Sequence, residues 1–361
     1  MASGKSRPLF AQIVVGPPGS GKSTYCAAVS RLLRSIGRRH VLINLDPAIG
    51  GTETLPYEPD IDIRELVISN AVMERFHLGP NGALMYCMEY LLENIDWLER
   101  ALVEFHQSGN ESLDHTPAGD TRRDQGRDHS SNDGSNTGSW VDYIIIDMPG
   151  QVELYAHHNA TRDILRQLTT RGRNASGLDL RAVVVNLIDA QYCMDTGKFL
   201  SASLIALMTM LNVGLPHVNV LTKSDLFQAE YDRHVADLDS AFERVESPHA
   251  TDYEAAESAT EGFLQTNTLY QLDVYAEGED LLTLAPADNT PSAALSRAVA
   301  ELLDDYGLVR FLSVSVFDPP SLLQVLEQAD RASGYCYTDR DMANILSLRS
   351  MPKRDGEERE H

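Results

Sequence analysis

The sequence predicts an α/β protein in which a mainly parallel β-sheet is wrapped by helices on both faces. Several apolar runs, such as residues 10–15 and 141–146, are continuous rather than alternating, which is typical of strands buried on both faces. Segments with helical apolar spacing follow these runs, so strands and helices alternate along the chain. Ligands of such sheets bind at the carboxyl ends of the strands, so the turns after the apolar runs are the places to search for a site.

The composition allows one large core, with or without a small subdomain, and argues against several kinds of partner. The chain has 361 residues, of which 43% are hydrophobic. A net charge of -23 argues against direct nucleic-acid binding, because neutralising phosphates needs clustered Lys and Arg. The longest apolar stretch, 199–211, is interrupted by Ser and Thr and is too short to span a bilayer, so no membrane partner is predicted. Four scattered cysteines predict neither a zinc site nor a disulfide framework.

A phosphate-binding loop follows the first apolar run. Its sequence, GPPGSGKST, matches GxxxxGK[ST] and precedes a segment, 25–33, with helical spacing. Glycines let several backbone N–H groups converge on phosphate oxygens, and the next helix presents its positive end to them. Lys22 then lies between the β- and γ-phosphates, Ser23 ligates Mg²⁺ and Thr24 reaches the α-phosphate. The predicted phosphate-binding residues are Gly16, Gly19, Ser20, Gly21, Lys22, Ser23 and Thr24. This P-loop places the predicted fold among the P-loop NTPases.

A carboxylate ends the second predicted strand. The run 38–45 is followed by Asp46, Pro47 and Ala48. At the carboxyl end of a parallel strand beside a P-loop, Asp46 is placed to contact the Mg²⁺ shell or the attacking water. The same residues also fit an Asx-turn before proline, and the sequence leaves both interpretations open.

The next segment predicts two helices joined by a turn. Residues 58–62 are acidic and turn-like, whereas 63–76 and 83–105 have helical apolar spacing. Gly79, Pro80 and Asn81 lie between the two helices. These are ordinary turn residues, so composition alone predicts a helix–helix turn and nothing more.

A second phosphate motif follows the strand predicted at 141–147. The sequence DMPGQ at its end fits DxxGQ. In this motif Asp147 can hold Mg²⁺ through water, Gly150 can donate its N–H to the γ-phosphate, and Gln151 can orient the nucleophilic water.

A guanine motif ends a later strand, 216–221. The sequence there is TKSD, with Thr222 first. Asp225 can accept hydrogen bonds from guanine N1–H and the 2-amino group, while the aliphatic stem of Lys223 lies over the ring. Adenine offers neither donor. As a bare tetrapeptide the motif is often accidental, but after both phosphate motifs it favours guanine.

The remaining segments continue the alternation of strands and helices, which together predict one domain. We predict helices at 152–171, 195–211, 292–306 and 320–332, and strands at 181–189 and 308–316. The predicted organisation is a mobile leader at 1–9, one domain at 10–333 and a charged tail at 350–361, with a polar disordered insertion at 107–139 and an acidic insertion region at 240–290. The loop at 316–321 would supply a further guanine contact, but the sequence assigns no residue to it.

Taken in order, these motifs resemble those of the GPN-loop GTPases. The resemblance rests on the P-loop, Asp46-Pro47-Ala48, Gly79-Pro80-Asn81, DMPGQ and TKSD. The stretch GPNGALMYCMEY and the later Gly334-Tyr335-Cys336 are similar to the second of the three eukaryotic paralogue types. The resemblance covers almost the whole chain outside 107–139 and parts of 240–290. Thr222 stands where the family often has Ser, and the 107–139 insertion could reposition a dimer contact.

The resemblance implies several properties that the residues alone do not. It implies a dimer, homotypic or formed with a paralogue, in which the inserted GPN helical region of one subunit reaches the phosphates bound by the other. Gly79 and Pro80 would then contact nucleotide, and Asn81 would donate to the γ-phosphate as charge develops. It also implies a role in assembling and importing RNA polymerase II, and by extension polymerase III, by a cytoplasmic protein that shuttles to the nucleus.

The leading hypothesis is therefore a GTPase with GTP or GDP and Mg²⁺ as ligands. Its predicted catalytic residues are Asp46, Asn81 and Gln151, and its predicted metal ligands are Ser23, Asp46 and Asp147. A GTP-loaded binding scaffold with incidental turnover is the alternative from another class. A related P-loop ATPase is a third, opposed by Asp225.

Overall fold

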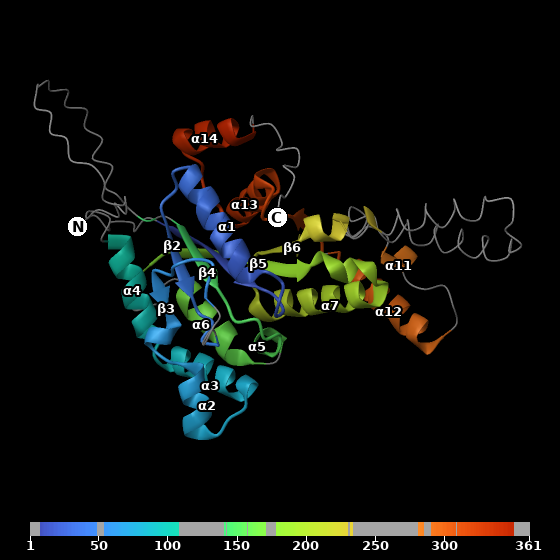
Figure 1. Ribbon diagram of the computed structural model, residues 1–361, viewed down its shortest axis with the longest axis horizontal. Helices are drawn as coiled ribbons and strands as arrows, with labels where there is room; N and C mark the ends of the chain where they lie inside the picture. Colours follow the sequence, from blue (N-terminus) through green and yellow to red (C-terminus); the bar gives the residue numbers. More distant parts are fainter. Residues whose placement is uncertain are drawn as a thin grey trace, which may run out of the picture.

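Seven parallel strands form the sheet of the described residues, which confirms the predicted fold class (Figure 1). The strands are β1 (Leu9–Val15), β2 (His40–Asn44), β3 (Ile61–Asp62), β4 (Tyr143–Asp147), β5 (Leu180–Asp189), β6 (His217–Thr222) and β7 (Phe311–Val314). Their spatial order is β3-β2-β4-β1-β5-β6-β7. The strand that carries the P-loop therefore lies at the centre of the sheet.

The computed structural model describes residues 8–48, 54–107, 141, 143–156, 158–170, 178–229, 232–233, 281–284, 290–307 and 309–349. The leader up to residue 7, the insertion from 108, most of the acidic 240–290 region and the 350–361 tail lie outside these residues. The described α-helices are α1 (Lys22–Ser35), α2 (Ser69–Phe76), α3 (Pro80–Glu93), α4 (Ile95–Gln107), α5 (Glu153–Ala156), α6 (Asn159–Thr169), α7 (Thr196–Val213), α11 (Leu281–Leu284), α12 (Pro291–Tyr306), α13 (Pro319–Ser333) and α14 (Asp339–Arg349), with 3₁₀ helices η1 (Ile63–Glu65) and η2 (Ala190–Met194).

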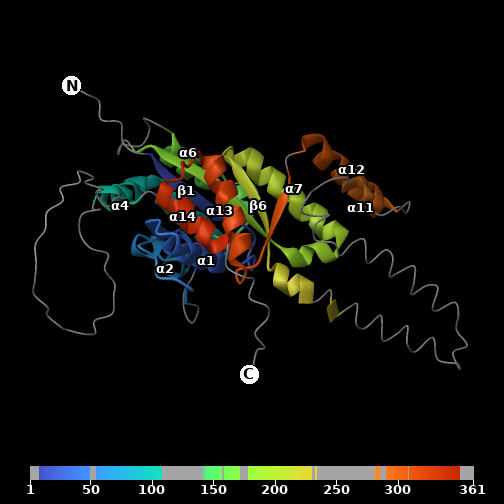
Figure 2. The ribbon, with the colours of Figure 1, turned by 90° about the horizontal axis from the view of Figure 1, so that it is seen from above.

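Each face of the sheet has its own core. One core joins the sheet to α3, α4 and α6, and the other joins it to α1, α13 and α14, on the opposite side (Figures 1 and 2). In β1, Ile13 belongs to the first core and its neighbour Val14 to the second. Because successive side chains of a strand point to opposite faces, a strand covered on both sides must be apolar throughout. A third cluster packs α7 and α12 against the β5, β6 and β7 side of the sheet.

The acidic stretch at 58–62 corrects one prediction. Its last two residues form strand β3, which pairs in parallel with β2, rather than belonging to a turn. The helix predicted at 63–76 is also divided, because Ile68 takes an extended backbone. That extension lets Leu66 and Val67 pack against the first core, so packing overrides the helical pattern.

Two further predicted helices are interrupted. The segment 83–105 divides at Asn94, whose side-chain amide donates to the Tyr90 carbonyl oxygen at 2.8 Å. Such side-chain bonds compete with the helical backbone ladder. The segment 152–171 divides at His158, whose backbone is extended and whose ring accepts from Ala160 N to cap α6.

Two helices extend beyond what the sequence predicted. Helix α14 follows α13 and was not predicted; its Ile345 is buried in the second core. Helix α7 is 18 residues long and is the one described helix that is long and apolar enough, by length and composition, to cross a membrane. In the fold, α7 buries Phe199 and Leu200 in the third cluster.

Candidate nucleotide-binding site

The P-loop joins β1 to α1 and packs closely on its surroundings. A Cβ on Gly16 would lie 2.3 Å from the Leu187 carbonyl oxygen, so only glycine fits there. Gly21 caps α1 with a φ of 86°. Lys22 Nζ donates to the Pro17 carbonyl oxygen at 3.1 Å. Burial lowers the pKa of Lys22, and the nearby carboxylates of Asp147 and Asp46 oppose that shift.

Asp147 is a buried carboxylate beside the P-loop. Tyr57 Oη donates to Asp147 Oδ2 at 2.8 Å, whereas Asp147 Oδ1 is buried without a hydrogen-bond partner in the described residues. Burial raises the pKa of Asp147, while the nearby hydroxyls of Ser23 and Tyr57 and the charge of Lys22 lower it. An unpartnered carboxylate oxygen beside a serine hydroxyl is a set of hard oxygen donors, which fits Mg²⁺.

The loop after β4 is fixed against the P-loop. Tyr155 Oη donates to the Pro149 carbonyl oxygen at 2.6 Å. A Cβ on Gly150 would lie 2.8 Å from Lys22 Nζ and 3.2 Å from Pro18 Cα, so the backbone here approaches the P-loop as closely as a glycine allows. Gln151 follows, half-buried, at the edge of this contact.

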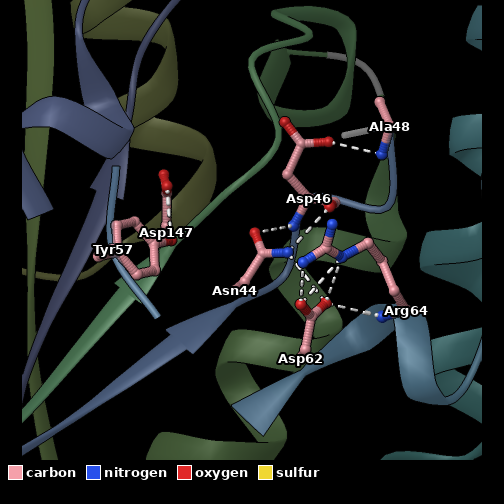
Figure 3. Close-up of polar contacts among 7 residues, drawn as sticks. All are labelled: Asn44, Asp46, Ala48, Tyr57, Asp62, Arg64 and Asp147. Carbon is pink, nitrogen blue, oxygen red and sulfur yellow. Dashed lines mark hydrogen bonds and ion pairs between the residues drawn. The ribbon is translucent and has the colours of Figure 1, made fainter. Parts of the chain in front are cut away.

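Asp46 forms the Asx-turn that the sequence allowed. Its Oδ1 accepts from Ala48 N at 2.9 Å, and its own N–H donates to Asn44 Oδ1 at 3.1 Å (Figure 3). Asp46 also lies close enough to Lys22 to raise the pKa of that lysine. The turn and the position beside the P-loop therefore coexist, because a carboxylate has more acceptor sites than one turn uses.

The guanine motif is attached to the P-loop by its first residue. Thr222 Oγ1 donates to the carbonyl oxygens of Ser20, at 2.8 Å, and Ile188, at 3.2 Å. Thr222 therefore links β6 to the P-loop, and its hydroxyl proton is already used in these hydrogen bonds. Lys223 has a left-handed backbone, with a φ of 60°, and its Nζ forms an ion pair with Asp189 Oδ2 at 2.6 Å. Asp225 is half-buried in the helical turn that follows.

The GPN residues form the predicted turn between α2 and α3. Gly79 caps α3 and Pro80 is its first residue, where a missing N–H costs nothing. Gly79, Pro80 and Asn81 are exposed. Within the described residues, no hydrogen bond joins Asn81 to the P-loop or to the loop after β4. The other predicted site residues converge at the carboxyl ends of β1, β2, β4 and β6, whereas the GPN turn joins α2 to α3.

Comparisons with known proteins find similarity to nucleotide-binding proteins. Residues 14–269 match a family model described as a conserved hypothetical ATP-binding protein. The chain is 35% identical over 341 residues to GPN-loop GTPase 2 of Danio rerio, covering 94% of this chain and 86% of the relative. It is 36% identical over 348 residues to GPN-loop GTPase 2 of Xenopus tropicalis, covering 94% and 88%.

The chain belongs to the GPN-loop GTPase family. Among solved structures, a GTPase from Pyrococcus abyssi in its apo form superposes with a TM-score of 0.57 at 19% identity, covering 91% of this chain and 98% of that one. At this identity the likeness concerns the fold alone.

Several residues around the site of this GPN-loop GTPase were not predicted. They are the side-chain partners of the predicted residues: Asn44, Tyr57, Asp62, Arg64 and Asp189. Asp189 carried a usable signal, because it ends a buried strand just as Asp147 does. Asp62 lies in the acidic stretch 58–62 that was predicted as a turn, whereas Asn44 lies in the strand predicted at 38–45 and Arg64 in the helix predicted at 63–76.

Proposed function

We propose that this GTPase binds guanine nucleotide together with Mg²⁺ and hydrolyses GTP by in-line attack of water. The observation that carries the proposal is the meeting of three groups at one edge of the sheet. These are the P-loop with buried Lys22, the carboxylate of Asp147 with an oxygen left unpartnered by the described residues, and the guanine motif attached to the P-loop through Thr222. This is where parallel α/β sheets bind ligands.

The residues divide the work of phosphoryl transfer between them. Ser23, Asp147 and Asp46 would hold the metal, which when bound neutralises charge on the β- and γ-phosphates. Lys22 and the N–H of Gly150 stabilise the γ-phosphate, and Gln151 orients the attacking water. Water oxygen bonds to the γ-phosphorus, the bond to the β–γ bridging oxygen breaks, and the proton of the water leaves with the phosphate.

The GPN turn would complete the site from a second subunit. Exposed Asn81 makes no hydrogen bond to the P-loop of its own chain among the residues that the structure describes. Close to it, α2, α3 and the turn between them expose apolar side chains of Phe76, Leu78 and Met85, which is the kind of surface that interfaces cover. We therefore include a dimer, homotypic or with a paralogue, in the proposal.

Guanine selectivity is tested by Asp225→Asn. Replacing the carboxylate with an amide removes the acceptor for the 2-amino group, so GDP affinity should fall by about 10- to 100-fold. Xanthine has a carbonyl oxygen at that position, which an amide can donate to, so XDP affinity should rise. Competition of GDP, XDP and ADP against labelled GDP measures this, with exposed Asp305→Asn on α12 as the control. Equal competition by ADP and GDP in the wild type would support the ATPase alternative.

The proposed cellular role is assembly and nuclear import of RNA polymerase II, extended to polymerase III, by a protein that is cytoplasmic and shuttles. It is supported by family membership only. Tagged protein should be recovered from its own cell extract once with a non-hydrolysable GTP analogue and once with GDP. We expect polymerase subunits or a paralogue to co-purify in one nucleotide state. Their absence in both states would leave the GTPase chemistry and remove this role.

A binding scaffold with incidental turnover is the second candidate, favoured by the net charge of -23, which suits basic clients. An Asn81→Ala, Gln151→Ala double variant that still binds GTP separates the two. Normal client assembly by that variant would favour the scaffold.

A further inference from the structure

The carboxylates of the site are held by one short segment, residues 57–64, which contains β3. This segment follows β2 in the chain and lies at the edge of the sheet, away from the P-loop strand (Figure 1). The pairing register places Asp62 beside Asn44, and Asn44 beside Asp147. Three polar residues of neighbouring strands therefore form one row at the carboxyl edge.

The first contact runs from Tyr57 to Asp147. The phenol donates to Oδ2 at 2.8 Å, and the ring of Tyr57 packs against the second core. The hydroxyl is therefore fixed by packing of its own ring. With one oxygen of Asp147 occupied, the other oxygen, Oδ1, is buried and has no hydrogen-bond partner among the described residues. A donor on one carboxylate oxygen determines where the second oxygen points.

The second contact is a series of hydrogen bonds that runs from Arg64 to Asp46. Arg64 Nε donates to both oxygens of Asp62 at 2.9 Å, and its Nη2 also donates to Asp62 Oδ2 (Figure 3). Asp62 Oδ1 accepts from Asn44 Nδ2 at 3.0 Å. Asn44 Oδ1 accepts from the Asp46 N–H, and Asn44 Nδ2 donates to the Asp46 carbonyl oxygen at 3.2 Å.

In this series of hydrogen bonds, each side chain fixes the orientation of the next. A guanidinium fork fixes the plane of the Asp62 carboxylate. Asp62 fixes which end of the Asn44 amide is the donor, since a carboxylate can only accept. Asn44 is fully buried, so its amide cannot exchange these partners for water. The backbone of Asp46 is held on both its N–H and its carbonyl as a result.

We propose that the 57–64 segment positions both carboxylates of the nucleotide site, Asp147 through Tyr57 and Asp46 through Arg64, Asp62 and Asn44. Tyr57, Asn44, Asp62 and Arg64 are positioning residues and not catalytic ones, because they act through the two aspartates. The inference rests on the proposed Mg²⁺ site.

The test is the Mg²⁺ requirement of GDP retention, which needs no turnover. Release of labelled GDP is followed while the Mg²⁺ concentration is varied. The Mg²⁺ midpoint is the Mg²⁺ concentration at which half of its effect on GDP release is reached. Tyr57→Phe keeps the ring and removes only the donor, so this midpoint should rise about 10-fold or more. Arg64→Lys removes the guanidinium contact with both oxygens of Asp62, and it should raise the Mg²⁺ midpoint independently of Tyr57. With EDTA present, both variants should release GDP at the wild-type rate, because the positioning acts through the metal.

Matched controls remove the same groups elsewhere. Tyr306→Phe deletes an exposed phenol at the end of α12, and Arg331→Lys changes an exposed guanidinium on α13. Both should keep the wild-type midpoint. Thermal unfolding reports whether each variant is folded, and a merely structural role would lower the melting temperature without moving the midpoint.

The outcomes separate this inference from the proposed function. A wild-type protein whose GDP release does not respond to Mg²⁺ would remove the metal site itself. A wild type that responds, with folded Tyr57→Phe and Arg64→Lys variants at the same midpoint, would overturn the positioning role alone. A shift in the Tyr57→Phe variant alone would confine the role to Asp147, and a shift in the Arg64→Lys variant alone would confine it to Asp46. Binding of Mn²⁺ to the GDP complex, measured by electron paramagnetic resonance, gives the same comparison without kinetics.

Discussion

Asn81→Ala should slow GTP hydrolysis by about 10²- to 10³-fold while GDP affinity stays near the wild-type value. The proposed role of the amide is to donate to the γ-phosphate as charge develops, and such donors matter more in the transition state than in the ground state. Asn81 is exposed on the first turn of α3, so its truncation should not disturb the core. Single-turnover hydrolysis and labelled-GDP binding on the same preparation separate the two effects.

A mixing experiment decides whether Asn81 acts across a dimer. An Asn81→Ala subunit retains its P-loop, and a Lys22→Ala subunit retains its GPN turn. If the loop acts in trans, a mixed dimer contains one complete site. Random mixing should then restore about a quarter of the wild-type activity, since about half of the dimers are mixed and each has one site of two. If the loop acts within its own subunit, mixing should restore nothing.

A matched control for Asn81 lies on the neighbouring helix. Asn70 is exposed on the first turn of α2, so Asn70→Ala removes the same amide from a similar position and should leave turnover unchanged. Unchanged turnover by the Asn81 variant as well would remove the amide from the mechanism altogether. Loss of GDP binding by the Asn81 variant would instead mean that the GPN turn supports the fold of the nucleotide site.

The predicted site residues that the structure brings to one edge of the sheet share one property. Lys22, Asp147 and Asp225 each lie at the end of a buried strand or a few residues beyond it, so local order determines their position at the carboxyl edge of the sheet. Thr222 shows the limit of this reasoning. Its place in the motif predicted a nucleotide contact, whereas its hydroxyl bonds to Ser20 and Ile188, which only the packing of β6 against β5 and the P-loop could reveal.

Tyr57, which sequence reasoning missed, acts through a long-range contact. Tyr57 and Asp147 are 90 positions apart, and no spacing rule joins them. The broken helices have the same origin, because the choice between a continuous and a divided helix at Asn94 depends on what its faces pack against. Strand β3 is two residues long and carries too little pattern to be detected.

Asp330→Ala should cost about 3 to 5 kcal/mol of folding free energy, the largest stability effect we expect from a single polar substitution here. Arg38, just after α1, donates to both oxygens of Asp330 on α13 at 3.0 and 2.8 Å, and both side chains are almost fully buried. The guanidinium also lies 3.9 Å from the ring centre of Tyr335. Removing the carboxylate would leave a buried cation without a counter-ion.

The same helix provides the control. Glu327 on α13 pairs with Arg349 at 2.7 Å, but the arginine side chain there is 58% exposed. Glu327→Ala should therefore cost less than about 1 kcal/mol. An Arg38→Met, Asp330→Leu double variant should recover much of the loss, because two apolar side chains leave no buried charge. Urea unfolding of the wild type and these variants measures the differences. Equal midpoints for Asp330→Ala and Glu327→Ala would show that burial of the pair contributes nothing to holding α13 against α1.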